Sequence, residues 1–228
     1  MLKAELHTHI RGDPIDTFIR YSAYSLIDRA AAQGFQVLAI TCHDYIYQDI
    51  KAKNYAREKG ILLLQGMEMT LQGKHTLIYN ITPEQAGSVK TFADLQRLKE
   101  RHADILVIAP HPFHYTSTCL DDIILKYPDL FDAWEYSFFY TRVLNPNQKT
   151  LRLARQLGKP VIGNSDVHDL SDLGRTYTLI DAAWTEKAVI EAIRKKKVQV
   201  ATEPLTSGEM ARILGRMAYT MLQRRLNL

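Results

Sequence analysis

The stretch QVLAITCHD at residues 36–44 decides the fold of this chain. Its apolar part, 36–41, has the length and composition of a buried β-strand, and it ends directly on polar residues. Apolar residues recur at helical spacing on either side of it, over 16–33 and over 48–59. This alternation of helix, strand and helix predicts an α/β fold in which a parallel sheet is covered by helices.

The same rhythm continues in both directions along the chain. Further strands are expected at 2–7, 61–65, 75–81, 104–109, 131–136, 160–163 and 198–201. Further helices are expected at 91–101, 120–126, 147–157 and 185–196. About seven such units favour a closed or nearly closed barrel, which carries its active site at the carboxyl ends of the strands. No Gly/Ser tract, proline-rich stretch or block of like charge divides the chain, so we expect one domain over 1–228.

The last segment, 206–228, has the pattern of an extra amphipathic helix. Its apolar stripe consists of Met210, Ile213, Leu214, Met217, Met221 and Leu222. Thr206 or Ser207 can cap its first turn, and arginines occupy the remaining faces. We expect the stripe to dock on the barrel, with a dimer contact or an anionic membrane surface as the alternatives.

Composition limits the partners and the location. The chain has 228 residues and a net charge of +4, which favours an anionic substrate but is too weak to argue for nucleic acid. Cys42 and Cys119 are the only cysteines, so no disulfide framework is expected. The start lacks a signal-peptide core, and no apolar run has the length of a membrane span, which predicts a cytoplasmic protein. The sequence leaves the oligomeric state open.

Residue types that bind metal ions follow the apolar runs one after another. Six of the eight histidines stand at predicted strand ends with carboxylates, in the segments HTH (7–9), CHD (42–44), MEM (67–69), KH (74–75), PHP (110–112) and SDVH (165–168). Residues two apart on a strand project to one side, so His7 and His9 are expected to point together, as are Asp166 and His168. Imidazoles and carboxylates in one pocket suit zinc, manganese or iron, and Glu68 is the candidate bridge between ions.

In this order the motifs resemble those of the PHP (polymerase and histidinol phosphatase) superfamily of metal-dependent phosphoesterases. The matching segments are LHTH (6–9), ITCHD (40–44), QGMEM (65–69), GKH (73–75), IAPHP (108–112) and NSDVH (164–168). No single motif is specific, and the ordered set carries the resemblance over most of the chain. The resemblance implies a distorted (β/α)7 barrel that binds three divalent metal ions.

The resemblance also implies a ligand set. The first ion is assigned to His7, His9, Glu68 and Asp166, the second to Glu68, His75 and His111, and the third to Asp13, His43 and His168. The loop around Asp13 reads RGDP where the family often has SDG, so Asp16 is the alternative ligand. Cys42 stands where the family usually has Asp, which predicts a weaker or different third ion, with a thiolate ligand as a further alternative.

By the same resemblance, the expected reaction is hydrolysis of a phosphate ester by a metal-bound hydroxide at the trinuclear site. Glu68 would hold the ions that activate the nucleophile, and His168 or a metal-bound water would protonate the leaving group. The candidates for binding the substrate are Arg175, the expected phosphate clamp, and Arg11, Arg142 and His114.

Other residues near predicted strand ends have structural or supporting interpretations. Glu135 is expected to hydrogen-bond a ligand histidine, and His102 is expected to be a structural residue because it precedes a strand. Four aromatic residues either stack on a base or sugar or pack at the rim, namely Tyr115, Phe138, Phe139 and Tyr140.

The favoured substrate is a small phosphomonoester, or a nucleotide or sugar phosphate. Within the family, histidinol phosphatase and a 3′–5′ exonuclease-like module are the alternatives, and the lack of attached nucleic-acid modules argues against the exonuclease. A noncatalytic metal-binding or regulatory domain is the alternative from another class, and Cys42 is the only hint for it.

Overall fold

The computed structural model describes residues 1–226, with side chains described through residue 219. Its centre is a nine-stranded sheet in the order β7-β6-β5-β4-β3-β2-β1-β8-β9. The strands are β1 (Leu2–Glu5), β2 (Val37–Ile40), β3 (Leu62–Leu71), β4 (Lys74–Tyr79), β5 (Leu106–Ala109), β6 (Ala133–Ser137), β7 (Val161–Asn164), β8 (Thr176–Ile180) and β9 (Val198–Thr202). The helices are α1 (Ala23–Ala32), α2 (Ile50–Glu58), α3 (Pro83–Ser88), α4 (Phe92–Arg101), α5 (Ile123–Lys126), α6 (Asn147–Gln156), α7 (Glu186–Arg194) and α8 (Ser207–Leu226).

The sheet is mixed, so the expected parallel sheet is present only in part. The pairs β1–β2, β2–β3, β5–β6 and β6–β7 are parallel, and the pairs β3–β4, β4–β5, β1–β8 and β8–β9 are antiparallel. β4 reverses direction because Gln72 and Gly73 form a two-residue hairpin turn with φ values of 51° and 77°. β8 and α3 were not expected from the sequence.

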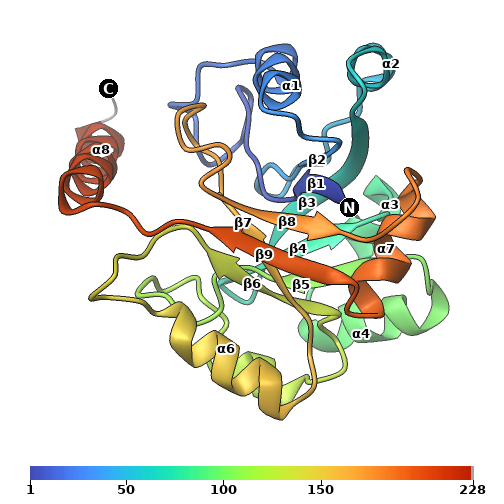
Figure 1. Cartoon of the computed structure of the whole chain (residues 1–228). Coiled ribbons are helices and arrows are strands. Elements are labelled where there is room, and N and C mark those ends of the chain that lie inside the picture. The colour runs from blue at the N-terminus through green and yellow to red at the C-terminus, as the bar shows by residue number, and fades with distance from the viewer. Residues whose placement is uncertain (227–228) are drawn as a thin grey trace.

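The sheet curls until its end strands meet, which confirms the expected nearly closed barrel. Figure 1 shows β7, β8 and β9 side by side near the centre of the view. At this seam the Thr178 hydroxyl group accepts a hydrogen bond from Gly163 N at 2.9 Å and donates one to Gly163 O at 2.8 Å. Glycine is needed because a Cβ atom at 163 would lie 2.8 Å from the carbonyl oxygen of Tyr177.

The helices cover the outside and one end of the barrel. α1 packs over β2 through an apolar cluster that includes Leu26 and Leu38. α4 packs through a second cluster that includes Phe92 and Val107. α7 lies against the start of β5, where Arg194 Nη2 donates a hydrogen bond to Ile105 O at 2.7 Å. The opposite end of the barrel, formed by the carboxyl ends of the parallel strands, is left to loops.

The first helix is shorter than the predicted 16–33. It begins at Ala23, and the residues before it form a loop, because Asp13 Oδ1 accepts hydrogen bonds from the amides of Ile15 and Asp16 at 2.9 Å. This turn places Asp16 at the open end of the barrel rather than on a helix.

Two further boundaries differ from the prediction at positions that matter for the site. β3 runs on to Leu71, so Glu68 lies inside a strand and not after one. Asp166 and His168 lie in the turn that follows β7, so the alternation of side chains along a strand does not explain why they face each other.

The expected C-terminal helix is confirmed as α8, which Figure 1 shows at the left edge, standing beside the barrel. Its first half docks, with Ile213 buried against Phe138 and Leu205, whereas Leu214 is 50% exposed. The parts of the prediction that lie outside the described residues are 227–228 and the side chains of Met221 and Leu222. Within the described part of the chain, every helix is too short or too polar to cross a bilayer.

Candidate metal centre

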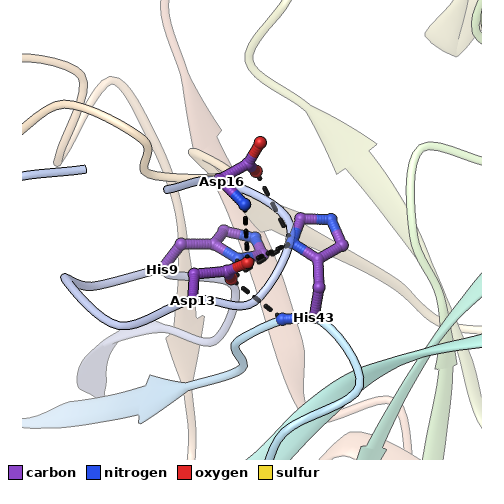
Figure 2. Close-up of side chains that lie close together, drawn as sticks. All are labelled: His9, Asp13, Asp16 and His43. Carbon is purple, nitrogen blue, oxygen red and sulfur yellow. Dashed lines mark hydrogen bonds and ion pairs between the residues drawn. The ribbon is translucent and has the colours of Figure 1, made fainter. Parts of the chain in front are cut away.

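The candidate ligands converge at the open end of the barrel from distant parts of the sequence. They come from the turns after β1, β2, β5 and β7, from within β3 and from the start of β4. Neighbouring imidazole rings lie 4.4 to 6.3 Å apart between centroids. Figure 2 shows one side of this cluster, where His9, Asp13, Asp16 and His43 point toward one another. The structure therefore brings together all six histidines that the sequence singled out.

The deepest part of the cluster consists of His7, His9 and Asp166. Asp166 Oδ1 lies 3.2 Å from His7 Nε2 and 3.4 Å from His9 Nε2. All three atoms are buried, and none makes a hydrogen bond within the described residues. Buried polar atoms without partners cost free energy, so three of them facing one point fit a bound cation.

Glu68 stands between two groups of imidazoles and is 1% exposed. Its Oε1 atom lies 2.9 Å from His75 Nδ1 and 3.4 Å from His111 Nε2. Its Oε2 atom lies 3.0 to 3.4 Å from the Nε2 atoms of His7, His9 and His43. One carboxylate with one oxygen in each group has the arrangement of a bridge between two ions.

His75 reaches the site from the beginning of a strand, not from its end. β4 runs antiparallel to β3, so the start of β4 lies at the same edge of the sheet as the end of β3. His75 pairs with Thr70, which is two residues from Glu68 and therefore on the same face of the sheet. The β3–β4 hairpin thus brings the carboxylate and this imidazole together.

Asp13 and Asp16 occupy different positions in the third group. Asp13 accepts hydrogen bonds from two amides of its own loop and from His43 N, and it lies 2.8 Å from His9 Nδ1 and 3.1 Å from His43 Nδ1. A carboxylate offers about four lone-pair positions, so few remain for an ion. Asp16 Oδ2 faces His168 Nε2 at 2.7 Å and His43 Nδ1 at 3.5 Å. Both aspartates stand in one group with His9 and His43 that could hold an ion. The geometry favours Asp16 as a ligand and Asp13 as the residue that orients the His9 ring.

Partners behind the imidazoles set their orientation. Glu135 Oε2 lies 2.9 Å from His7 Nδ1 and accepts a hydrogen bond from Asn164 Nδ2, while its Oε1 atom accepts one from His111 N. This is the contact that the sequence predicted for Glu135. His111 Nδ1 lies 3.6 Å from Cys119 Sγ, so a thiol stands behind that ring. Such contacts fix which ring nitrogen faces the ion.

Glu5 is a supporting residue that sequence reasoning missed. Its carboxylate is fully buried and accepts hydrogen bonds from His7 N at 3.2 Å and Ser165 N at 2.9 Å, so it joins the turn after β1 to the turn after β7. Burial raises the pKa of Glu5 to about 8. The signal available in the sequence was an acidic residue inside the short strand LKAEL, at 2–6.

Attraction between imidazoles and carboxylates sets the charge state of the cluster. Burial opposes ionisation of Glu68 and Asp166, yet the surrounding imidazolium charges hold the pKa of both carboxyls well below their usual range. Burial likewise opposes protonation of the rings, but neighbouring carboxylates raise the pKa of His43 to about 10 and that of His168 to about 9. Without a metal the cluster balances its charge with protons, which divalent cations would replace.

Two candidate ligands have unusual backbone conformations. His111 has φ of 28° and Asp166 has φ of 46°, in a region that residues with a side chain rarely adopt. Such conformations cost of order 1–3 kcal/mol each and cluster at functional sites. His111 N donates a hydrogen bond to Glu135 Oε1, and the amide of Val167, next to Asp166, donates one to His7 O.

The geometry gives no support to a thiolate ligand at Cys42. Its side chain is fully buried in the apolar cluster under α1. Burial raises the pKa of the Cys42 thiol to about 12, so the thiol is protonated at neutral pH.

The residues expected to bind the substrate are not gathered like the ligands. Arg175 forms an ion pair with Glu209 of α8, and Arg11 and Arg142 are exposed. The ring centroid of His114 lies 6.4 Å from that of His111, and burial lowers the pKa of His114 to about 4.

The aromatic candidates divide between packing and exposure. Phe138 and Phe139 pack against α8, and Tyr140 OH lies 3.0 Å from Thr202 Oγ1. Tyr115 is 74% exposed and free to contact a ligand at the rim. His102 is an exposed residue at the end of α4.

Sequence models of known families match most of this chain. The sequence model of the PHP domain matches residues 6–144, and the model of a PHP-associated segment matches residues 145–198. The crystal structure of PsfC from Pseudomonas syringae is similar with a TM-score of 0.68 and 14% identity, over 96% of this chain and 98% of that one.

Two other solved structures share the fold at lower similarity. A candidate metal-dependent phosphoesterase from Bifidobacterium adolescentis has a TM-score of 0.53 and 17% identity, over 73% of this chain and 87% of that one. An amidohydrolase from Chromobacterium violaceum, with bound sulfate and no metal, has a TM-score of 0.51 and 16% identity, over 72% of this chain and 87% of that one.

Proposed function

The chain belongs to the PHP domain family, and we propose that it hydrolyses a small phosphomonoester or a nucleotide or sugar phosphate. Membership of this family and the ligand cluster together support a metal-dependent hydrolase. The observation that carries the proposal is the position of Glu68 between two groups of imidazoles, with His7 and His9 on its Oε2 atom and His75 and His111 on its Oε1 atom. Within the described residues, every ion pair of Glu68 and Asp166 is with a histidine, so no lysine or arginine occupies the place of a cation.

We assign the residues to three metal positions. Glu68 is common to the first two, and Asp16 takes the place first given to Asp13 in the third. The three sets are His7, His9, Glu68 and Asp166; Glu68, His75 and His111; and Asp16, His43 and His168. Bound divalent cations such as zinc, manganese or iron neutralise phosphate oxygens and lower the pKa of water toward about 7.

In this proposal the protein's own residues orient the metal ligands and supply a proton to the leaving group. Glu135 and Asp13 orient the ligand rings, and the buried pocket keeps bulk water away from Glu68. His168 has a second role in the proposal, which is to give a proton to the leaving oxygen when the third position is empty. Arg175 remains our candidate for binding phosphate, with Arg11, Arg142 and His114 as further candidates.

Turnover of a generic aryl phosphate after metal analysis tests the proposal. The purified protein is expected to hold divalent metal and to hydrolyse the aryl phosphate faster when manganese or zinc is added. A panel of nucleotides, sugar phosphates, histidinol phosphate and labelled single strands then sorts the substrates. Full metal loading without turnover of any phosphate would contradict the proposal and would favour a noncatalytic metal-binding domain.

An aryl amide is the comparison substrate in this experiment, because one protein of similar structure is an amidohydrolase. Hydrolysis of an aryl amide but of no phosphate ester would keep the metal chemistry and overturn the substrate class. Hydrolysis of the phosphate alone is the expected result.

A further inference from the structure

α8 is an addition to the matched part of the chain. The family matches cover 6–144 and 145–198, and α8 begins after them at Ser207. Figure 1 shows it beside the barrel, joined to it through the segment after β9. Nothing in the proposed chemistry requires this helix, yet its first half makes charged contacts with a segment that carries two candidate ligands.

The charged contacts involve two arginine–carboxylate sets. Arg216 of α8 forms ion pairs with Asp172, which is 3% exposed, and with Asp169 at 3.3 Å. Glu209 of α8 forms an ion pair with Arg175. The three partners lie within 165–175, the turn after β7 that also holds Asp166 and His168. A guanidinium group shared by two carboxylates fixes their relative position better than a single exposed pair does.

The same segment is held from its inner side by different residues. Glu5 accepts hydrogen bonds from Ser165 N, and Asp16 Oδ2 faces His168 Nε2 at 2.7 Å. The segment is thus fixed between the buried carboxylates of the site and the charged side chains of α8. Asp166 in this segment has φ of 46°, a conformation that residues with a side chain rarely adopt.

We propose that α8 is a clasp that positions the ligand segment 165–175, so that Arg216 and Glu209 act on metal binding through Asp166 and His168. The inference rests on the proposed function, because it treats those two residues as ligands. Residues behind metal ligands typically change affinity by about 10–100-fold when they are removed. Arg216 and Glu209 contact residues that lie near Asp166 and His168 in the chain, and they act on the two ligands through those residues. We therefore expect their removal to weaken the binding of the ions held by Asp166 and His168 by about tenfold, the lower end of that range.

The test uses the full chain with Arg216→Ala and Glu209→Gln, singly and together. Glutamine at 209 can still complete the capping box with Thr206, so that variant removes the charge without removing the helix cap. Metal affinities are measured by competition with a chelator, using zinc and manganese as probes. Hydrogen exchange is followed in 165–175 without metal. The double variant is expected to lose about tenfold in affinity at two positions, to keep the ion of Glu68, His75 and His111, and to exchange faster in 165–175.

Arg155→Ala is the matched control, since Arg155 is exposed on α6 and has no ion pair among the described side chains. It should match the wild type. The clasp would be overturned if the double variant bound metal and exchanged hydrogen as the wild type does. It would also be overturned if exchange increased equally across the whole sheet, because that result indicates general destabilisation. If the wild type itself binds no metal, both the proposed function and the clasp fail. If the wild type binds metal and turns over phosphate while the variants are unchanged, only the clasp fails.

Discussion

At the scale of residues, the site depends on Glu68, whose two carboxylate oxygens face different groups of imidazoles. Glu68→Gln keeps the shape of the side chain but removes the charge that two ions would share. We expect the rate on an aryl phosphate to fall by about a thousandfold, the size of a loss of several kcal/mol of charge stabilisation. Metal analysis should show at least one ion lost. The control is Glu84→Gln on the exposed part of α3. Equal rates in the two variants would contradict the assignment.

Substitution of Glu135 tests the residues that hold the ligand rings in place. Its carboxylate holds His7 Nδ1 and His111 N, and glutamine would present a donor where an acceptor is needed. Glu135→Gln is expected to weaken metal binding by about 10–100-fold while saturating metal restores most of the activity. Titration with zinc or manganese measures this, and Glu58→Gln, on the exposed side of α2, is the control. Loss of activity that excess metal cannot restore would indicate a direct catalytic role instead.

Metal binding should depend on pH with a defined sign. The pKa of His43 is raised to about 10 and that of His168 to about 9, so both rings carry protons at pH 7 in the metal-free protein. Only the neutral ring binds a metal, so binding releases protons and affinity should rise as pH increases toward these values. Calorimetry in buffers with different ionisation enthalpies measures the released protons. An affinity that does not change between pH 6 and pH 9 would contradict the raised pKa values.

At the scale of elements, the closure of the sheet depends on Gly163. A methyl group there would lie 2.8 Å from Tyr177 O and 2.9 Å from Val200 Cγ1, and neither atom can move without disturbing the seam that β7 makes with β8 and β9. Gly163→Ala is expected to lower the free energy of unfolding by about 1–3 kcal/mol. Urea denaturation measures the change. Gly215→Ala in α8, where the added Cβ atom meets nothing within 4 Å, should be neutral or slightly stabilising.

The same scale explains which elements the sequence predicted well. β2 and β5 are short apolar runs between helical segments, and pattern alone placed them within a few residues. β4 and β8 were harder because their directions depend on partners. Nothing in HTLIY, at 75–79, indicates an antiparallel neighbour, and one of the two partners of β8 is β1, far away in sequence.

At the scale of the whole molecule, the metals are expected to be part of the folded structure. Ions that bind only the native state stabilise it by about 4 kcal/mol at a thousandfold excess over Kd. Removing them with a chelator should lower the Tm by on the order of 10 °C, and added manganese or zinc should restore it. Thermal scans with and without chelator measure this. The Tm of Glu68→Gln should respond much less, and an unchanged wild-type Tm after verified metal loss would contradict the expectation.

The sequence by itself determined which residues would meet, because strand ends of a barrel share one rim and His7, His43, Glu68 and Asp166 each stand at or near such an end. Tertiary structure alone decided how they meet. The hairpin brings in His75, a loop rather than a helix presents Asp16, and α8 clamps the turn that holds Asp166. The reason is physical: periodic burial is a local property that a sequence displays, whereas the direction of a side chain at a turn depends on hydrogen bonds and ion pairs with residues far away in the chain.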